Sequence, residues 1–207
     1  GFAWSGHVSM YGVWVDSATG RRFVNELANR KVRANAIFAQ LAKGHECLAI
    51  GDVGTAASFA EIRPGMLNRQ MERKCVFEYK TLEDLAKAHK VPLEALKQTI
   101  GTYNDAIKAG KDPVGRPVNP KAKPLANGPW YVARMQPKVH HCMGGLYTNE
   151  KAQVYHVEGH LIEGLYAAGE ATGGVHGAVR LGSCGTADSL IYGRIAGQEV
   201  AKAKAWM

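Results

Sequence analysis

The 207-residue chain lacks several features that define whole classes of protein. No stretch approaches the roughly 18 consecutive apolar residues of a transmembrane helix, so we expect no membrane span. None of the four cysteines lies at CxxC spacing, which argues against a zinc knuckle or a redox dithiol, and we expect free thiols. The net charge is +8, but no block of like charges occurs and aromatic residues make up only 8%, so no nucleic-acid partner is expected.

The start of the chain also lacks an initiating methionine and the apolar region of a signal peptide. The opening Gly-Phe-Ala-Trp resembles a cut end, so we expect a longer gene product. Whether that product is cytoplasmic or periplasmic stays open at this point.

Glycine, by contrast, is abundant and unevenly placed. There are 24 glycines, about 12% against a usual ~7%, and 12 of the 24 fall within residues 144–207. No collagen-like period accompanies them. This pattern predicts a backbone folded closely around a ligand.

The first half of the chain mixes strand and helix signals. Two β-rich runs, 11–15 and 22–24, flank a polar turn and predict a hairpin. Helical spacing follows Glu26, and Cys47–Asp52 predicts a short buried strand. Glu26 and Arg30 are four apart, so we expect an ordinary i,i+4 ion pair with Arg33 solvated beside it.

Residues 81–110 predict two helices, with Thr81 as an N-cap, Pro92 in a first turn and Gly110 as the stop. Beyond them, residues 113–137 hold six of the eight prolines and no acidic residue. This stretch predicts an extended connector between two units.

The last third predicts a hairpin about Glu158-Gly159, a short strand over 165–168, a glycine-rich loop and a helix over 186–204. A carboxylate directly after a strand, here Glu170 after Gly169, can accept hydrogen bonds from ribose or ribityl hydroxyls, although a plain surface loop is the alternative. The start of the last helix would present free N–H groups to a phosphate, a carboxylate or a reduced flavin.

His140 and His141 are adjacent and would point to opposite faces of a strand, so we expect no metal site there or elsewhere. The alternative for each, and for His176, is a partly buried residue with its hydrogen bonds satisfied.

Four strings together carry a resemblance to a known family: GRRFVNE followed by Arg30, HHCMGG at 140–145, GLYAAGEATGGVHGAVRLG at 164–182 and YGRIAGQEVAK at 192–202. The chain resembles the C-terminal part of FAD-dependent fumarate reductase/succinate dehydrogenase-type flavoproteins. It is similar to the soluble flavocytochrome c fumarate reductases and to urocanate reductase within that family. The family's N-terminal GxGxxG fingerprint is missing from this chain.

The resemblance implies an α+β fold in two parts. Residues 1–137 would form a clamp, or capping, domain that includes the connector 113–137. Residues 138–207 would form the C-terminal segment of a Rossmann-like FAD-binding domain. A missing N-terminal segment or a partner chain would complete the FAD site, and an electron donor would be a further partner.

The resemblance also assigns roles to single residues. Arg30 matches the catalytic arginine that donates a proton while FAD N5 delivers hydride. The residues implied to bind a substrate carboxylate are His140, Arg180 and Ser183. The residues implied to contact FAD are His141, Gly169, Glu170, Gly185 and Thr186.

The function so implied is the reduction of a C=C bond in a small α,β-unsaturated carboxylic acid by a bacterial flavoprotein. Ser183-Cys184 replaces the family's usual Gly-Asn, so fumarate-, urocanate- and acrylate-like acids all stay open. Two alternatives remain: a non-catalytic remnant or subunit that completes the flavin site of a partner, and an FAD-dependent ketosteroid-type dehydrogenase.

Overall fold

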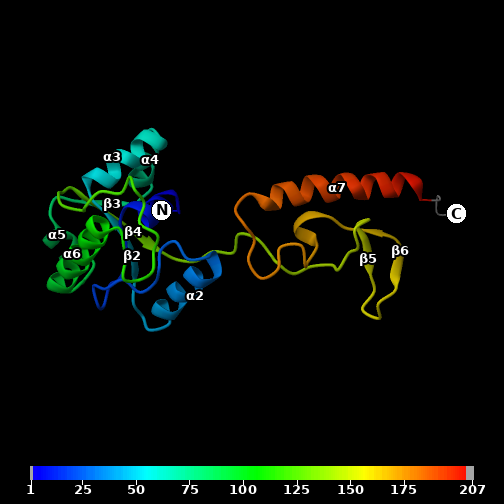
Figure 1. Cartoon of the computed structure of the whole chain (residues 1–207), viewed down its shortest axis with the longest axis horizontal. Coiled ribbons are helices and arrows are strands. Elements are labelled where there is room, and N and C mark those ends of the chain that lie inside the picture. Colours follow the sequence, from blue (N-terminus) through cyan, green and yellow to red (C-terminus); the bar gives the residue numbers. More distant parts are fainter. Residues whose placement is uncertain (1, 204–207) are drawn as a thin grey trace. The chain divides into compact units, whose positions relative to one another are not determined.

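The computed structural model describes residues 2–203 and separates into two compact units (Figure 1). Unit 1 is Gly1–Pro137 and unit 2 is Lys138–Met207. Both units combine helices with strands, as an α+β protein should. No helix within residues 2–203 has the length and apolar character needed to cross a membrane. Cys47, Cys142 and Cys184 are free thiols, as expected.

Unit 1 is built on a four-stranded antiparallel sheet in the order β1-β2-β4-β3. The strands are β1 (Val13–Asp16), β2 (Cys47–Gly51), β3 (Phe77–Tyr79) and β4 (Trp130–Met135). Every residue of β1 and β2 is buried. Apart from Asp16, the residues of these two strands are apolar or glycine, which fits a sheet that is covered on both faces.

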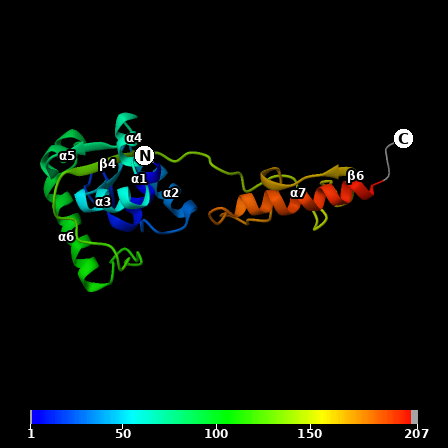
Figure 2. The ribbon, with the colours of Figure 1, turned by 90° about the horizontal axis from the view of Figure 1, so that it is seen from above.

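Alternate residues of each strand enter two separate cores, as strand geometry requires. On one face, Val13, Leu48 and Val132 pack against α5 (Leu82–Ala88) and α6 (Leu93–Ala109). Figures 1 and 2 show these two helices lying together.

The other face of the sheet meets Trp4, Ile37, Phe59 and Leu67. These residues come from four helices: α1 (Phe2–Tyr11), α2 (Arg30–Leu41), α3 (Val53–Ile62) and α4 (Met66–Glu72). Helices α1, α3 and α4 were not predicted from the sequence. The mixed apolar and small residues of α1 and α3 do not show a clear helical period.

The helices predicted over 81–110 are confirmed as α5 and α6. The Thr81 side chain accepts a hydrogen bond from the N–H of Asp84, which makes Thr81 the N-cap of α5. Gly110 ends α6 in the left-handed conformation, with φ +66°. The strand predicted at Cys47–Asp52 is confirmed as β2, and the helix after Glu26 as α2.

Two predictions about unit 1 are wrong. Residues 11–15 and 22–24 form no regular hairpin, because β1 pairs with β2 and only a single bridge joins Val15 to Arg22. The stretch 113–137 is not simply a connector, because β4 lies inside the sheet between β2 and β3. Pro129 directly precedes β4, and a proline at that point costs the sheet no ladder hydrogen bond.

Unit 2 contains the hairpin of β5 (Gln153–Tyr155) and β6 (Leu161–Tyr166), the 3-10 turn η1 (Gly169–Ala171) and α7 (Cys184–Lys202). The predicted hairpin is confirmed, and β6 is one strand rather than the two short runs expected. The long helix α7 packs along η1 and β6 (Figure 1). It begins two residues before Thr186, and its predicted end at Lys204 lies outside the described residues.

Candidate active site

Arg30 is the first residue of α2 and is exposed to solvent. The side chain of Asn29 caps the helix by accepting a hydrogen bond from the N–H of Val32 at 3.0 Å. Within residues 2–203, no side chain forms a hydrogen bond or ion pair with Arg30. The guanidinium of Arg30 is therefore available to a ligand.

The ion pair predicted between Glu26 and Arg30 is wrong. The Glu26 carboxylate is fully buried and accepts two hydrogen bonds from Arg22, at 2.7 Å from Nε and 2.5 Å from Nη2. Arg116 lies 3.7 Å from the same carboxylate and donates to Asp112 at 3.1 Å. These four side chains, each at most 5% exposed, form a neutral cluster that we call the buried charge quartet.

The contacts within the quartet stabilise the charged forms of Asp112 and Arg22. Burial by itself would raise the pKa of Asp112, but hydrogen bonds from Arg22 and from the N–H of Val114 outweigh it and hold that pKa below its ordinary value. Burial likewise opposes the charge of Arg22, and the carboxylates of Glu26 and Asp112 raise its pKa nonetheless. The quartet joins the segment before α2 to the segment that follows α6.

Arg33 is not solvated as expected. Its guanidinium donates to the backbone carbonyl of Glu26 at 3.1 Å and lies 5.6 Å from the ring centre of Trp14. Burial is the main cause that lowers the pKa of Arg33, and the charge of Arg30 adds to it. A second cation is thus fixed one turn along α2 from Arg30.

In unit 2, Glu170 is fixed between a backbone group and an imidazole. Its carboxylate accepts a hydrogen bond from the N–H of Cys142 at 2.9 Å and lies 3.2 Å from Nδ1 of His141. The Cys142 hydrogen bond is the largest cause that lowers the pKa of Glu170, with further lowering from His141 and His140. An ionised carboxylate is therefore held just after β6, where hydroxyl groups of a ligand could donate to it.

His141 also contacts His176, which in turn pairs with Asp188. Its ring meets the ring of His176 edge-on at 5.4 Å, and Nε2 of His176 lies 3.2 Å from the carboxylate of Asp188. Asp188 is buried on α7 and was not singled out from the sequence. It stands 12 residues after His176, and no local spacing rule connects the two.

Three buried polar atoms of this region have no hydrogen-bond partner: His141 Nε2, Arg180 Nε and Asp188 Oδ1. Buried polar groups are normally paired, so each of these atoms has an unused bonding capacity. FAD has many polar groups that could use it. This observation supports the fit of the region to FAD.

Gly185 brings several predicted residues together at the start of α7. A Cβ atom there would lie 3.2 Å from Cε1 of His141 and 3.3 Å from Cδ of Arg180. Ser183 precedes the helix with φ +67°, a conformation few non-glycine residues adopt, and its side chain makes no cap hydrogen bond. Thr186 donates its N–H to the carbonyl of Ser183 at 3.1 Å.

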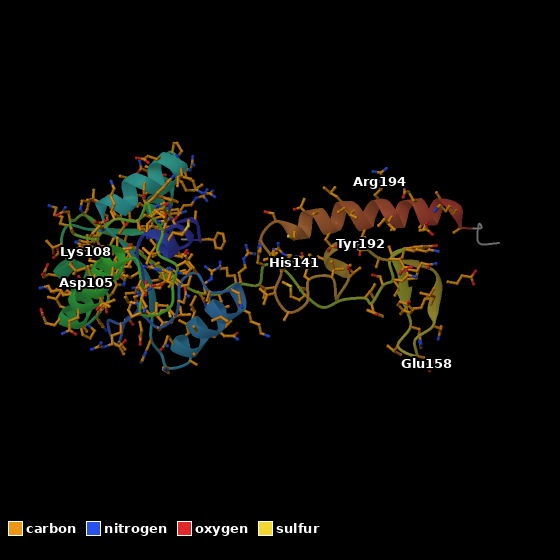
Figure 3. The ribbon with its side chains drawn as sticks, viewed as in Figure 1. Asp105, Lys108, His141, Glu158, Tyr192 and Arg194 are labelled. Carbon is orange, nitrogen blue, oxygen red and sulfur yellow. The ribbon has the colours of Figure 1, made fainter. Side chains whose placement is uncertain are left out.

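His140 is exposed, and no hydrogen bond or ion pair within residues 2–203 joins it to Arg180. Arg180 is buried and donates to the backbone carbonyl of Leu181 at 3.0 Å. His140 and His141 do not lie in a strand, contrary to expectation, because residues 136–142 form no regular element. Figure 3 shows His141 beneath α7, with Arg194 projecting from the other side of that helix.

Close backbone packing holds the glycine-rich segments of this site together. Leu146 pairs with Thr172 in a parallel bridge, and a Cβ atom on Gly145 would lie 2.8 Å from the carbonyl carbon of Ala171. Only glycine allows this approach. The glycine excess noted in the sequence thus has a structural cause at this position.

Replacing Gly145 with alanine should therefore separate the 144–146 segment from residues 171–173 and lower the stability of unit 2 by about 1–3 kcal/mol, in line with overpacking. Gly144 is the matched control, because a Cβ atom there meets nothing within 4 Å. Thermal unfolding followed by circular dichroism would compare Gly145→Ala with Gly144→Ala. Equal midpoints for the two variants would contradict the prediction.

Comparison with protein families matches residues 6–186 to the FAD binding domain. The chain is 38% identical over 179 residues to NADH:acrylate oxidoreductase of Vibrio harveyi, covering 86% of this chain and 17% of that protein. It is 35% identical to the acrylate reductase flavoprotein subunit of Shewanella woodyi, covering 92% and 39%. For fumarate reductase (cytochrome) of Shewanella frigidimarina the identity is 38%, covering 88% and 31%.

Two solved structures are also similar. One is the open conformation of a flavocytochrome c3 fumarate reductase, with TM-score 0.69 and 32% identity, covering 96% of this chain and 34% of that chain. The other is a 3-ketosteroid delta1-dehydrogenase from Sterolibacterium denitrificans, with TM-score 0.75 and 25% identity, covering 96% and 40%. The chain spans between 17% and 39% of the length of the three curated relatives.

Proposed function

The chain belongs to the FAD binding domain family, and from this premise we propose that it is part of a flavin-dependent reductase of the C=C bond of an α,β-unsaturated carboxylate. The substrate is a small acid of the fumarate, urocanate or acrylate type. The observation that carries the proposal is Arg180, a buried arginine with an unpaired Nε beside the residues that suit FAD.

Each unit has its own part in this proposal. Residues 1–137 are the clamp, or capping, domain and residues 138–207 are the C-terminal segment of the FAD-binding domain. Because this chain spans a minor share of its relatives, a further segment or a partner chain supplies the rest of the FAD site. An electron donor reduces the enzyme.

The FAD-contacting residues are His141, Gly169, Glu170, Gly185 and Thr186. The ionised carboxylate of Glu170 accepts hydrogen bonds from cofactor hydroxyl groups, and Nε2 of His141 gains a partner that it lacks within the chain. The N-terminus of α7, at Gly185 and Thr186, stabilises negative charge on the cofactor ring. When bound and reduced, FAD supplies hydride from N5 to the substrate β-carbon.

His140, Arg180 and Ser183 bind the substrate carboxylate. Addition of hydride to the double bond pushes negative charge onto the α-carbon and the carboxylate. A positive group placed beforehand at the carboxylate stabilises this charge as it develops. Ser183 has a hydroxyl that caps no helix N–H and is free to donate to the same carboxylate.

Arg30 donates the proton that completes the reaction, from a guanidinium N–H to the α-carbon. A guanidinium is a very weak acid, so this step requires a strongly basic carbon and transfer as that carbon forms.

The proposal is tested with the chain completed by an upstream FAD-binding segment and loaded with FAD. Bleaching of reduced methyl viologen is followed with fumarate, urocanate and acrylate as separate oxidants. Turnover with one of them is expected. If none of these acids is reduced, the reductase proposal is wrong and the chain is better explained as a non-catalytic part of a flavin site.

A ketosteroid-type dehydrogenase is the second candidate, favoured by the similar fold of the Sterolibacterium enzyme. Such a substrate has no carboxylate, so it would leave His140 and Arg180 without a role. Adding a 3-ketosteroid and an electron-accepting dye to the same protein separates the two candidates. Dye reduction with the steroid, without reduction of any unsaturated acid, would favour the dehydrogenase.

Replacing Arg180 with glutamine is expected to lower kcat/KM for the unsaturated acid about 10- to 100-fold, because one or more charge-assisted hydrogen bonds worth about 1.5–3 kcal/mol are lost. The matched control is Arg194→Gln, which removes an exposed arginine from the other side of α7 (Figure 3). Steady-state kinetics on both variants provide the measurement. The carboxylate-binding role would be untenable if the two variants had the same kcat/KM.

A further inference from the structure

The turn of the β5–β6 hairpin carries two histidines and a glutamate in the sequence His-Val-Glu-Gly-His. The N–H of His156 donates to the carbonyl of His160 at 2.8 Å, and the N–H of Gly159 donates to the carbonyl of His156 at 2.9 Å. Gly159 adopts φ +90°, which glycine tolerates and other residues resist. The backbone therefore fixes the spacing of His156 and His160 at the two sides of one tight turn.

The three side chains of this turn gather on one side of it. The imidazole rings of His156 and His160 stack with centroids 4.6 Å apart and planes 21° from parallel. A carboxylate oxygen of Glu158 lies 3.7 Å from Nδ1 of His156. One potential ligand atom from each residue lies within 4.8 Å of the other two, and no other such group of three occurs within residues 2–203.

This donor set has a definite chemical preference. Two imidazole nitrogens with one carboxylate oxygen suit Zn²⁺ and its neighbours in the first transition row, whereas Mg²⁺ and Ca²⁺ prefer all-oxygen sites. Ligands at the usual Zn–N distance of about 2.0–2.1 Å must lie about 3.3 Å apart in a tetrahedron. To direct both nitrogen lone pairs at one ion, the two rings must turn out of the stacked arrangement, and the exposure of these side chains to solvent leaves room for that rotation.

We propose that His156, Glu158 and His160 form a binding site for a divalent transition-metal ion of the Zn²⁺ type at the tip of the β5–β6 hairpin. The fourth position of the tetrahedron is left to water. Figure 3 shows Glu158 at the tip of the hairpin and His141 at a different place in unit 2, so the metal site is separate from the proposed FAD site. The inference does not depend on the proposed function.

No metal site was expected from the sequence, because His140 and His141 are adjacent and no cysteine pair has CxxC spacing. Positions i, i+2 and i+4 share one face of an extended strand, but His156, Glu158 and His160 lie in a turn, so this spacing did not by itself indicate a ligand set. It becomes a ligand set only when a turn at Glu158-Gly159 reverses the chain. The bound ion would link the two sides of this turn.

Titration of the EDTA-treated 207-residue chain with Zn²⁺ in a calorimeter tests the proposal. We expect one ion per chain, bound with micromolar affinity and not displaced by millimolar Mg²⁺. His160→Gln and Glu158→Gln should each weaken binding at least tenfold. Two matched controls, His45→Gln in unit 1 and Glu163→Gln on β6, should bind as the unchanged chain does.

Backbone amide NMR spectra of the same samples locate the ion and show that each variant is folded. Shifts induced by Zn²⁺ should be confined to residues 155–161. Absence of saturable binding would overturn the proposal. So would full affinity in His160→Gln, or shifts centred on His141 and His176 instead of the hairpin.

Discussion

Replacing Glu26 with glutamine is expected to destabilise unit 1 by about 3–5 kcal/mol, the usual cost of breaking a buried ion pair from one side. Glu26 is the fully buried carboxylate that joins Arg22 to Arg116 and also accepts the N–H of Trp14 at 3.1 Å. The neutral amide would leave the buried charge quartet with an uncompensated positive charge. Several kcal/mol is a large share of the total stability of a domain.

Urea unfolding followed by tryptophan fluorescence measures this effect. Glu61→Gln is the matched control, because Glu61 is exposed on α3 and the same substitution there removes no buried partner. The control is expected to stay within about 0.5 kcal/mol of the unchanged protein. A similar small change for Glu26→Gln would show that the quartet contributes little.

Replacing Arg30 with lysine in the completed, FAD-loaded protein is expected to lower kcat by about 10²- to 10⁴-fold while KM changes little, as for loss of a proton-donating group. Lysine keeps the positive charge but lacks the planar, forked guanidinium. Because Arg30 is exposed and forms no ion pair within residues 2–203, the change should leave the fold intact.

Arg63→Lys, an identical substitution at an exposed position after α3, is the control and should keep full turnover. Kinetics with the best unsaturated acid and a thermal unfolding curve for each variant complete the experiment. Full activity in Arg30→Lys would remove Arg30 from the proton-donating role. A raised KM at constant kcat would assign it to substrate binding instead.

Local sequence signals predicted the parts of the fold that depend on neighbouring residues. The α5–α6 pair was predicted because Thr81 and Gly110 act within one turn of their own helices. The hairpin about Glu158-Gly159 was predicted because its turn also depends only on neighbouring residues. The proline-rich stretch 113–137 was wrongly predicted to be only a connector. Its residues 130–135 form strand β4 because they pair with β2 and β3, which lie far away in the sequence.

Some parts of the candidate site were likewise predicted from the sequence, and others were found only in the structure. The strings around His141, Gly169 and Glu170 could be identified from the sequence, and the contact of His141 with Glu170 appeared only on folding. His176 and Asp188 form a buried pair that no spacing rule would find. Arg30 was identified by resemblance, while its expected partner Glu26 turned out to bind Arg22.

By itself the sequence determined the type of chain, its helix ends, its tight turns and its glycine-rich loop, because each of these follows from conformational preferences over a few residues. It also carried the strings that indicate a flavoprotein. Only the tertiary structure decided which charges pair, which strand fills the sheet and which side chains meet at the hairpin tip. Those outcomes depend on side chains brought together by folding, and burial makes the energy of each contact depend on all its neighbours.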